Sequence, residues 1–203
     1  MKLFGHPDSG HAFKVRLFLA HAGIAHDYEV VDIRLPREAR QAAFRDNAPY
    51  GEVPLLLLDD GRALAQSNAI LLHLAANDGG HAGTDDPSRA RCREWLFWEA
   101  NKIGMCLPQL RAFHRFEDHG IEEGARAWLE RRYAHDVGVL EATFADGRRW
   151  ILGGDGPSVA DFSLCGYLVH ADEAKVAVPV HVTAWLERLR ALPAWRQPYE
   201  MLA

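Results

Sequence analysis

Residues 2–33 alternate between strand and helix periodicity, and this alternation constrains the fold more than any other feature of the chain. KLFGH at 2–6 is short and apolar enough for a strand, and HDYEVVDI at 26–33 runs apolar with β-branched residues, as a strand does. Between them, apolar residues cluster on one side of a helical pattern that ends at Gly23. The segment therefore predicts a β-α-β unit.

The turn that leads into this first helix is polar and contains no cysteine. A helix N-terminus presents unpaired amide groups and a partial positive charge. The start of this helix is therefore suited to an anion.

The α/β pattern continues beyond this unit. Four further elements are predicted, namely a short helix over 36–47, a buried strand over 53–61, its hairpin partner over 62–67 and a helix over 67–78. The resulting order is β-α-β-α-β-β-α. We expect these elements to form an N-terminal α/β domain over 1–78.

The composition changes after this domain. GGHAGTDDPS at 79–88 has turn chemistry and is interpreted as a linker. Helical patterns follow over 89–113, 124–146, 157–171 and 179–192. Pro108 marks a possible kink in the first of them. The second domain, 89–203, is therefore expected to be all-helical.

Charge and composition exclude several classes of function. The net charge is −5 and no dense run of Lys and Arg occurs, which argues against nucleic-acid binding. The N-terminus does not resemble a signal peptide, and no apolar run approaches the roughly 20 residues of a membrane span. The eleven histidines form no H-E-x-x-H motif, so no metal is expected.

The three cysteines are widely separated in the sequence. Cys92, Cys106 and Cys165 form no C-x-x-C motif. This pattern favours free buried thiols in a reducing compartment. We therefore expect a cytoplasmic protein.

SVADFSL provides the strongest local signal in the helical part. Ser158 can cap the helix that follows it, and Asp161, three residues later, can accept backbone amides in return. We interpret the pair as structural. The alternative is that Asp161 is a catalytic acid.

Four segments together resemble the cytosolic glutathione S-transferases of the bacterial type. They are the turn containing Ser9-Gly10, APYGEVPLL at 48–56, QSNAI at 66–70 and GGDGPSVADFSL at 153–164. The resemblance covers nearly the whole chain. It implies a thioredoxin-like N-terminal domain, an all-helical C-terminal domain, glutathione as co-substrate and a homodimer.

The resemblance also implies which residues bind glutathione. Val53-Pro54 matches a Val-Pro pair with a cis peptide bond, which leaves the valine backbone free to pair with the cysteinyl part of glutathione. The alternative is an ordinary edge-strand proline. Gln66-Ser67 matches a pair at which the serine binds the γ-glutamyl carboxylate, although Ser67 can also be a simple helix cap.

Ser9 matches the hydroxyl that hydrogen-bonds the glutathione sulfur in the family. Such a bond favours the reactive thiolate, whereas a plain N-cap is the alternative role. His11 stands where related turns often carry Asn, and it either assists Ser9 or is an exposed first-turn residue. Lys14 matches the lysine of the motif or is simply a solvated helix residue.

Glu52 departs from the family pattern, because lysine is common at this position. The departure weakens any assumed contact with the glycine carboxylate of glutathione. Arg37, Arg40 and Arg45 are the candidate replacements, and the sequence does not choose between them.

The electrophile that accepts glutathione would bind beside the first long helix of the second domain. Trp98, Asn101, Met105 and Phe113 are the candidate pocket residues, and core packing is the alternative for each of them. The expected function is transfer of the glutathione thiolate to a small hydrophobic electrophile. The alternatives are glutathione-dependent reduction of a disulfide or peroxide, and a binding module without turnover.

Overall fold

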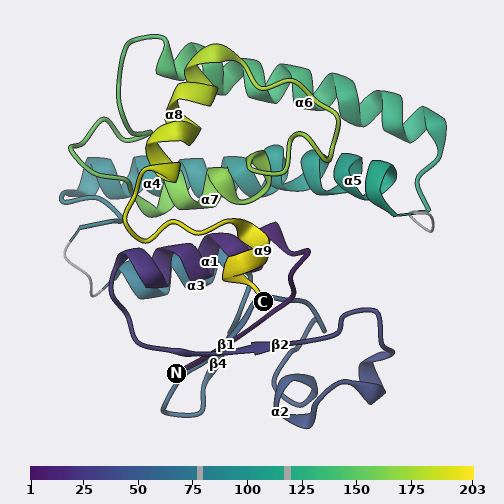
Figure 1. Cartoon of the computed structure of the whole chain (residues 1–203). Helices are drawn as coiled ribbons and strands as arrows, with labels where there is room; N and C mark the ends of the chain where they lie inside the picture. Colours follow the sequence, from purple (N-terminus) through teal and green to yellow (C-terminus); the bar gives the residue numbers. More distant parts are fainter. Residues whose placement is uncertain (77–79, 117–119) are drawn as a thin grey trace. The chain divides into compact units, whose positions relative to one another are not determined.

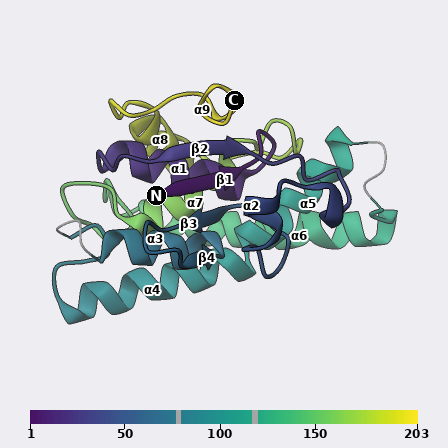
Figure 2. The ribbon, with the colours of Figure 1, turned by 90° about the horizontal axis from the view of Figure 1, so that it is seen from below.

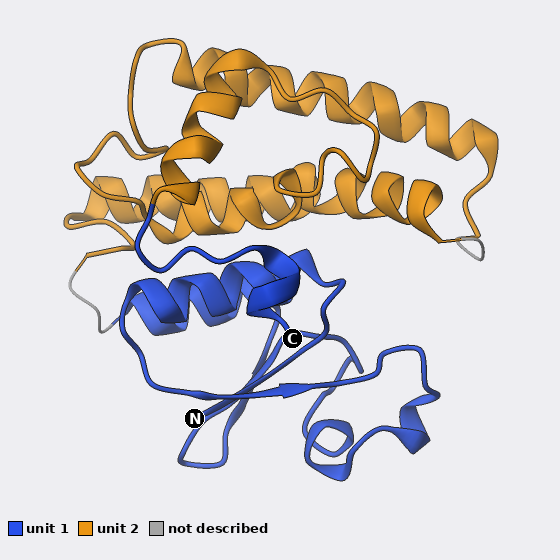
Figure 3. Cartoon of the chain, in the orientation of Figure 1, with its two compact units in different colours: residues 1–79, 192–203 blue, residues 80–191 orange. Residues whose placement is uncertain are grey.

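The computed structural model describes residues 1–76, 80–116 and 120–203. The chain divides into two compact units, shown in blue and orange in Figure 3. Unit 1 comprises Met1–Gly79 together with Leu192–Ala203, and unit 2 comprises Gly80–Ala191. The expected boundary between residues 78 and 79 lies outside the described residues.

Unit 1 is built on a mixed four-stranded sheet (Figure 1). Its strands are β1 (Lys2–Gly5), β2 (Asp27–Val30), β3 (Leu55–Leu57) and β4 (Ala63–Ala65). They lie in the order β2-β1-β3-β4, which Figure 2 shows from below. β1 runs parallel to β2 and antiparallel to β3, and β3 runs antiparallel to β4. The β-α-β-α-β-β-α order predicted from the sequence and the thioredoxin-like fold that the family resemblance implies are therefore confirmed.

The helices of unit 1 are mostly short. They are α1 (Gly10–His21), the 3-10 turn η1 (Arg37–Ala39), α2 (Ala42–Arg45), α3 (Ser67–Ala75) and α9 (Pro198–Met201). The single helix predicted over 36–47 is wrong in extent, since Arg40 has extended backbone (ψ 157°) and separates η1 from α2. The last two residues of the helix predicted over 67–78 lie outside the described residues.

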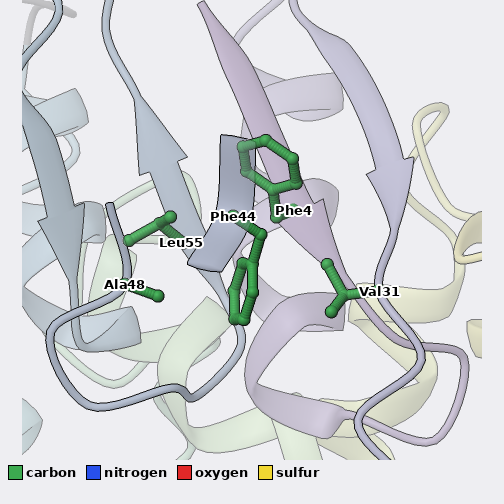
Figure 4. Close-up of a cluster of buried hydrophobic side chains, with 5 residues drawn as sticks. All are labelled: Phe4, Val31, Phe44, Ala48 and Leu55. Carbon is green, nitrogen blue, oxygen red and sulfur yellow. The ribbon is translucent and has the colours of Figure 1, made fainter. Parts of the chain in front are cut away.

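A compact apolar cluster joins the sheet to α2. Figure 4 shows Phe44 of α2 in the middle of a group whose members are Phe4, Val31, Ala48 and Leu55. The rings of Phe4 and Phe44 are 5.9 Å apart between centroids and tilted by 58°. This cluster anchors the long β2–β3 connection to the sheet, because it takes residues from both ends of that connection.

The end of the chain packs on α1. The ring of Phe13 lies edge-on to Trp195, with 5.4 Å between centroids, and the Arg16 guanidinium donates to the carbonyl oxygen of Met201. The final residues therefore belong to unit 1, whereas the sequence placed them in a helical domain over 89–203. These residues belong to unit 1 because of their tertiary contacts with α1, and the periodicity of their sequence does not predict those contacts.

Helices are the only regular secondary structure in the described residues of unit 2. Its helices are α4 (Asp86–Asn101), α5 (Ile103–Arg115), α6 (Glu123–Phe144), α7 (Val159–Leu168) and α8 (Val180–Arg190). Every residue of α7 is buried, and this helix packs against α4 and α5. α6 packs against α5 and α8. No described helix is long and apolar enough to cross a membrane.

Two details of the first long helical pattern differ from expectation. α4 begins inside the expected linker over 79–88, because Asp85 and Ser88 form a capping box with hydrogen bonds of 2.8 and 3.1 Å. Pro108, where a kink is expected, lies inside α5, and a break that was not expected falls at Lys102 (φ −119°, ψ −99°), between α4 and α5. The chain approaches itself closely there, and a side chain at Gly104 would clash with the Glu99 carboxylate.

Candidate functional site

The N-terminus of α3 presents a buried hydroxyl. Ser67 is the first residue of the helix and is only 9% exposed. Its side chain makes no hydrogen bond to another residue that the structure describes. The preceding residue, Gln66, does not cap the helix with its side chain either. The first turn of α3 therefore offers an uncapped N-terminus and an available hydroxyl to an anion.

Gln66 is held in an unusual backbone conformation. Its φ of 69° lies in the left-handed region, which costs a residue with a side chain on the order of 1–3 kcal/mol. The side chain of Gln66 donates from Nε2 to Oε2 of Glu52 at 3.3 Å. This hydrogen bond links the start of α3 to the segment that precedes β3.

The Val53-Pro54 peptide bond lies directly after Glu52 and is cis, as the resemblance implied. The ladder of β3 begins two residues later, at Leu55. No hydrogen bond joins the Val53 backbone to another described residue. The amide and carbonyl of Val53 are therefore available to the backbone of a bound peptide.

Ser9 lies at the other candidate position, the start of α1. It is the N-cap residue, is 7% exposed, and its Oγ accepts from the amide of Ala12 at 3.1 Å. A serine hydroxyl that accepts one bond still has its own proton to donate. Capping and donation to a ligand are therefore compatible at Ser9.

The turn before Ser9 contains a buried histidine that the sequence analysis missed. Nδ1 of His6 accepts from the amide of Asp8 at 3.1 Å, and the carbonyl of His6 accepts from the amide of Ser9 at 2.9 Å. Burial lowers the pKa of His6, which agrees with a neutral ring that accepts at Nδ1. The Asp8 carboxylate in turn accepts from Arg34 at 3.3 Å. The sequence H-P-D-S at 6–9 carried a signal for this turn, because a histidine two residues before Asp8 can accept from the Asp8 amide.

His11 and Lys14 both lie on α1. His11 is half-buried in the first turn. Lys14 is fully buried, so the alternative of a solvated helix lysine is wrong. A lysine is rarely buried completely without a specific role for its charge.

The three candidate arginines differ in their hydrogen-bond partners. Arg40 donates to the carbonyls of Ile33, Leu35 and Gly51 at 2.6–3.0 Å. Arg37 donates to the carbonyl of Ala48 at 2.7 Å, and its Cδ would lie 3.8 Å from a side chain at Gly51.

Arg45 forms an exposed pair with Asp46 at 2.8 Å. Arg37 and Arg40 therefore lie near Gly51, two residues before Val53, whereas Arg45 is engaged with its own neighbour.

The four candidate pocket residues all lie in unit 2. Trp98 and Asn101 are on α4, and Met105 and Phe113 are on α5. Trp98, Met105 and Phe113 are half-buried, and Asn101 is exposed. Trp98 lies edge-on to Trp95 at 5.3 Å, and Arg126 lies over the ring of Phe113 at 5.4 Å. Their role in an acceptor pocket stays a prediction.

Asp161 is the hub of a buried hydrogen-bond network. Its Oδ2 accepts from the amide and hydroxyl of Ser158, both at 2.8 Å. Its Oδ1 accepts from the amide of Ile151 and from Nε1 of Trp185, both at 2.9 Å. Burial raises the pKa of the carboxyl, and the four donors oppose that effect. All the lone-pair positions of Asp161 are directed at the protein itself.

The three cysteines lie on helices of unit 2, on α4, α5 and α7. Cys92, Cys106 and Cys165 are all buried and free. Burial raises the pKa of Cys92 to about 11 and that of Cys106 to about 12. In the described part of the chain, no group of three or more His, Cys, Asp or Glu side chains is arranged to hold a metal ion.

Comparisons with known proteins show which family the chain resembles. The family model for the glutathione S-transferase N-terminal domain matches residues 8–77. The chain is 30% identical to maleylacetoacetate isomerase of Pseudomonas aeruginosa, over 98% of this chain and 95% of the relative. It is 29% identical to the disulfide-bond oxidoreductase YfcG of Escherichia coli, over 96% of this chain and 91% of the relative.

A solved structure extends the similarity to the whole fold. The crystal structure of a glutathione S-transferase from Xanthobacter autotrophicus has a TM-score of 0.84 and 29% identity, with 100% of this chain and 99% of that chain covered. The thioredoxin-like sheet, the helical second unit and the matches along the sequence define one class of protein. The chain belongs to the glutathione S-transferase family and is an enzyme of that family.

Proposed function

We propose that this chain binds reduced glutathione and transfers its sulfur to a small hydrophobic electrophile. The observation that carries the proposal is Ser67, a buried hydroxyl without a protein partner at the uncapped N-terminus of α3. The γ-glutamyl carboxylate of glutathione supplies the anion that this position favours. The hydroxyl and the first amides of α3 donate to it, and the helix dipole adds to the attraction.

The cysteinyl part of glutathione pairs with Val53. An extended peptide needs one donor and one acceptor from the protein backbone, and Val53 makes no backbone hydrogen bond within the described residues. Arg37 is the candidate for the glycine carboxylate, because its guanidinium lies beside Gly51 and makes fewer backbone contacts than that of Arg40.

Ser9 acts on the sulfur. A thiol with a pKa near 8.5 is mostly protonated at neutral pH. Donation from the Ser9 hydroxyl favours the thiolate, which is the nucleophile. The thiolate attacks the electrophilic carbon, a carbon–sulfur bond forms, and the leaving group departs with the electron pair of its broken bond. His11 is the candidate assistant in the same turn of α1.

Ser9→Ala tests the role of this hydroxyl. We expect kcat/KM with an aromatic halide to fall on the order of tenfold, which corresponds to about one pKa unit of the bound thiol. The dissociation constant of glutathione should change about twofold or less, because the hydroxyl acts mainly on the sulfur. Kinetics and calorimetry measure the two quantities.

Ser9→Thr is the matched control, since threonine keeps both the hydroxyl and the cap. Its kcat/KM should stay close to that of the original protein. An equal loss of binding and turnover in Ser9→Ala would reduce Ser9 to a ligand-holding residue.

Disulfide reduction is the second candidate, favoured by the 29% identity to a relative named a disulfide-bond oxidoreductase. The same thiolate would attack a sulfur atom, and a second thiol would complete the reduction. All three cysteines of the chain are buried, so that thiol would be another glutathione. Parallel turnover assays with a model disulfide, a peroxide and an aromatic halide separate the candidates. Glutathione binding without turnover of any of them would indicate a binding module.

The family resemblance supplies two further proposals. We propose that the protein is a homodimer, as cytosolic members of the family usually are. We also propose a cytoplasmic role in detoxification, supported by the three free thiols, which persist in a reducing compartment.

A further inference from the structure

His6 accepts two hydrogen bonds from the turn between β1 and α1. Nδ1 of its ring accepts from the amide of Asp8 at 3.1 Å, and its carbonyl oxygen accepts from the amide of Ser9 at 2.9 Å. Ser9 then begins α1, since its own carbonyl accepts from the amide of Phe13 at 2.9 Å. One residue therefore holds both of the consecutive amides that lead into the helix at Ser9.

The hydrogen bond to the ring of His6 requires the neutral form of the side chain. A ring nitrogen accepts only while it carries no proton, and both nitrogens of a protonated histidine are donors. Nδ1 of His26, by contrast, lies 2.9 Å from the carbonyl oxygen of Ile24, and Nδ1 of His181 lies 2.6 Å from the Glu141 carboxylate. A protonated ring keeps contacts with oxygen acceptors of this kind, whereas it loses a contact with an amide.

A protonated His6 has a different partner within reach. Oδ2 of Asp8 lies 3.9 Å from Nδ1 of His6, and the same oxygen accepts from Arg34 at 3.3 Å. Protonation therefore exchanges the Asp8 amide for the Asp8 carboxylate as the favoured partner of the ring.

The groups that face His6 decide which form of its ring is populated. Burial has the largest effect and lowers the pKa of His6. The Arg34 charge acts in the same direction, whereas the Asp8 and Asp32 carboxylates oppose it. At neutral pH the ring is therefore neutral, which is the form that accepts from the Asp8 amide.

We propose that His6 is a positioning residue for Ser9, and that protonation of its ring releases the turn and slows sulfur transfer. The neutral ring fixes the turn, and the Ser9 hydroxyl then donates to the glutathione sulfur. The proton comes from solvent, and no covalent bond of the protein changes. This inference rests on the proposed function, because it needs a Ser9 hydroxyl that acts on the sulfur.

Two substitutions separate the hydrogen bond of the ring from its titration. Oδ1 of asparagine and Nδ1 of histidine are both bonded to Cγ, so His6→Asn keeps an acceptor that does not titrate. His6→Leu removes the acceptor. At pH 7.5, kcat/KM should fall on the order of tenfold in His6→Leu, as expected of Ser9→Ala, and stay within about twofold in His6→Asn.

The pH profile tests the role of the proton. Every variant loses activity in acid because the glutathione thiolate is protonated, so the informative quantity is the ratio of kcat/KM in His6→Asn to kcat/KM in the original protein. This ratio should rise from about one at pH 7.5 toward about ten in acid, because only the original protein loses the hydrogen bond. Circular dichroism sets the acid limit, at which both proteins are still folded.

His26→Asn is the matched control for the pH profile. His26 is a half-buried histidine of the same unit, and its ring faces a carbonyl oxygen. Its ratio to the original protein should stay at about one throughout the profile, since no amide depends on its neutral ring.

A double variant shows whether His6 acts through Ser9. His6→Leu added to Ser9→Ala should lower kcat/KM by a further twofold or less, at about the limit of additivity, because the positioned hydroxyl is already absent. A further loss on the order of tenfold would overturn the proposal, since His6 would then act independently of Ser9.

The outcomes distinguish this proposal from the proposed function. Absence of glutathione turnover in the original protein would overturn the proposed function itself. Turnover that His6→Leu leaves unchanged, or a His6→Asn ratio that stays flat down to the acid limit, would overturn only the role of His6. The ratio does not need the leucine variant, so it decides the proposal even where His6→Leu fails to fold.

Discussion

Asp161 illustrates how one side chain can stabilise several elements. Its carboxylate accepts from Ser158 at the start of α7, from the amide of Ile151 before that helix, and from Trp185 of α8. The residue is fully buried, so each donor depends on it for a partner. A structural role explains this geometry better than a catalytic one, because no lone pair is directed at solvent.

Asp161→Asn tests the structural role. The asparagine amide keeps one oxygen and replaces the other with an NH2 donor. In one orientation this donor faces the amide and hydroxyl of Ser158, and in the other it faces the Ile151 amide and Trp185 Nε1. We expect the free energy of unfolding to fall by about 3 kcal/mol, the cost of leaving one or two buried donors unpaired. Urea denaturation measures it.

Asp155→Asn is the control, since Asp155 is exposed in the same loop region. It should change the stability by about 0.5 kcal/mol or less. A loss of glutathione turnover in folded Asp161→Asn, without a loss of stability, would favour the catalytic alternative.

Site residues with a local sequence signature could be predicted, whereas those that depend on tertiary contacts could not. Ser67 and Ser158 could be predicted because helix starts leave a local signature of capping residues. The link between Glu52 and Gln66 could not, because it forms only when the β3–β4 hairpin brings these residues together. The burial of Lys14 likewise depends on tertiary packing.

At the scale of elements, the end of α7 and the middle of α5 share a buried charge cluster. Nδ1 of His170 lies 3.2 Å from Oε1 of Glu173, and Oε2 of Glu173 accepts from Arg111 at 2.9 Å and lies 3.4 Å from Arg115. Burial, reinforced by the Arg111 charge, lowers the pKa of His170 to about 4. The histidine is therefore neutral in the folded protein at neutral pH.

This shift predicts a pH-dependent stability. The unfolded state binds a proton at His170 near pH 6.5, whereas the folded state does not until about pH 4, so acidification through this window favours unfolding. Between pH 7.5 and 5 the contribution to the loss of stability is about 2 kcal/mol. Denaturation at a series of pH values measures the slope.

His170→Gln should flatten the slope, because glutamine does not titrate. His135→Gln, at an exposed position on α6, serves as the control and should keep the slope of the original protein. A slope in His170→Gln as steep as in the original protein would assign the effect to another group.

The order of the elements was accessible from the sequence, but their ends were not. Periodicity is a local property, and it predicted the strands and main helices in the correct order. At the break at Lys102, Gly104 approaches Glu99 closely, and such an approach has no signature in the periodicity. The position of α9 depends on Trp195 and Phe13, which lie far apart in the sequence.

At the scale of the whole molecule, the burial of all three cysteines predicts an inert set of thiols. Burial holds the pKa of Cys92 at about 11 and that of Cys106 at about 12, so almost no thiolate exists at neutral pH. We expect a colorimetric thiol reagent to label essentially no thiol in the native protein and all three after denaturation. Rapid labelling of the native protein at pH 7 would contradict this burial.

In the proposed function, the γ-glutamyl carboxylate of glutathione binds at Ser67. Calorimetric titration with reduced glutathione tests it most directly, on the original protein, on Ser67→Ala and on the control Ser88→Ala. Ser88 also lies in the first turn of a helix, α4, but in the other unit. The variant Ser67→Ala should bind more weakly by about 1–3 kcal/mol, the contribution of a charge-assisted hydrogen bond.

The control should bind like the original protein. That result would place the tripeptide at the start of α3 and leave the second substrate to be identified. An affinity that Ser67→Ala leaves unchanged would contradict the account, because the carboxylate would then lie elsewhere.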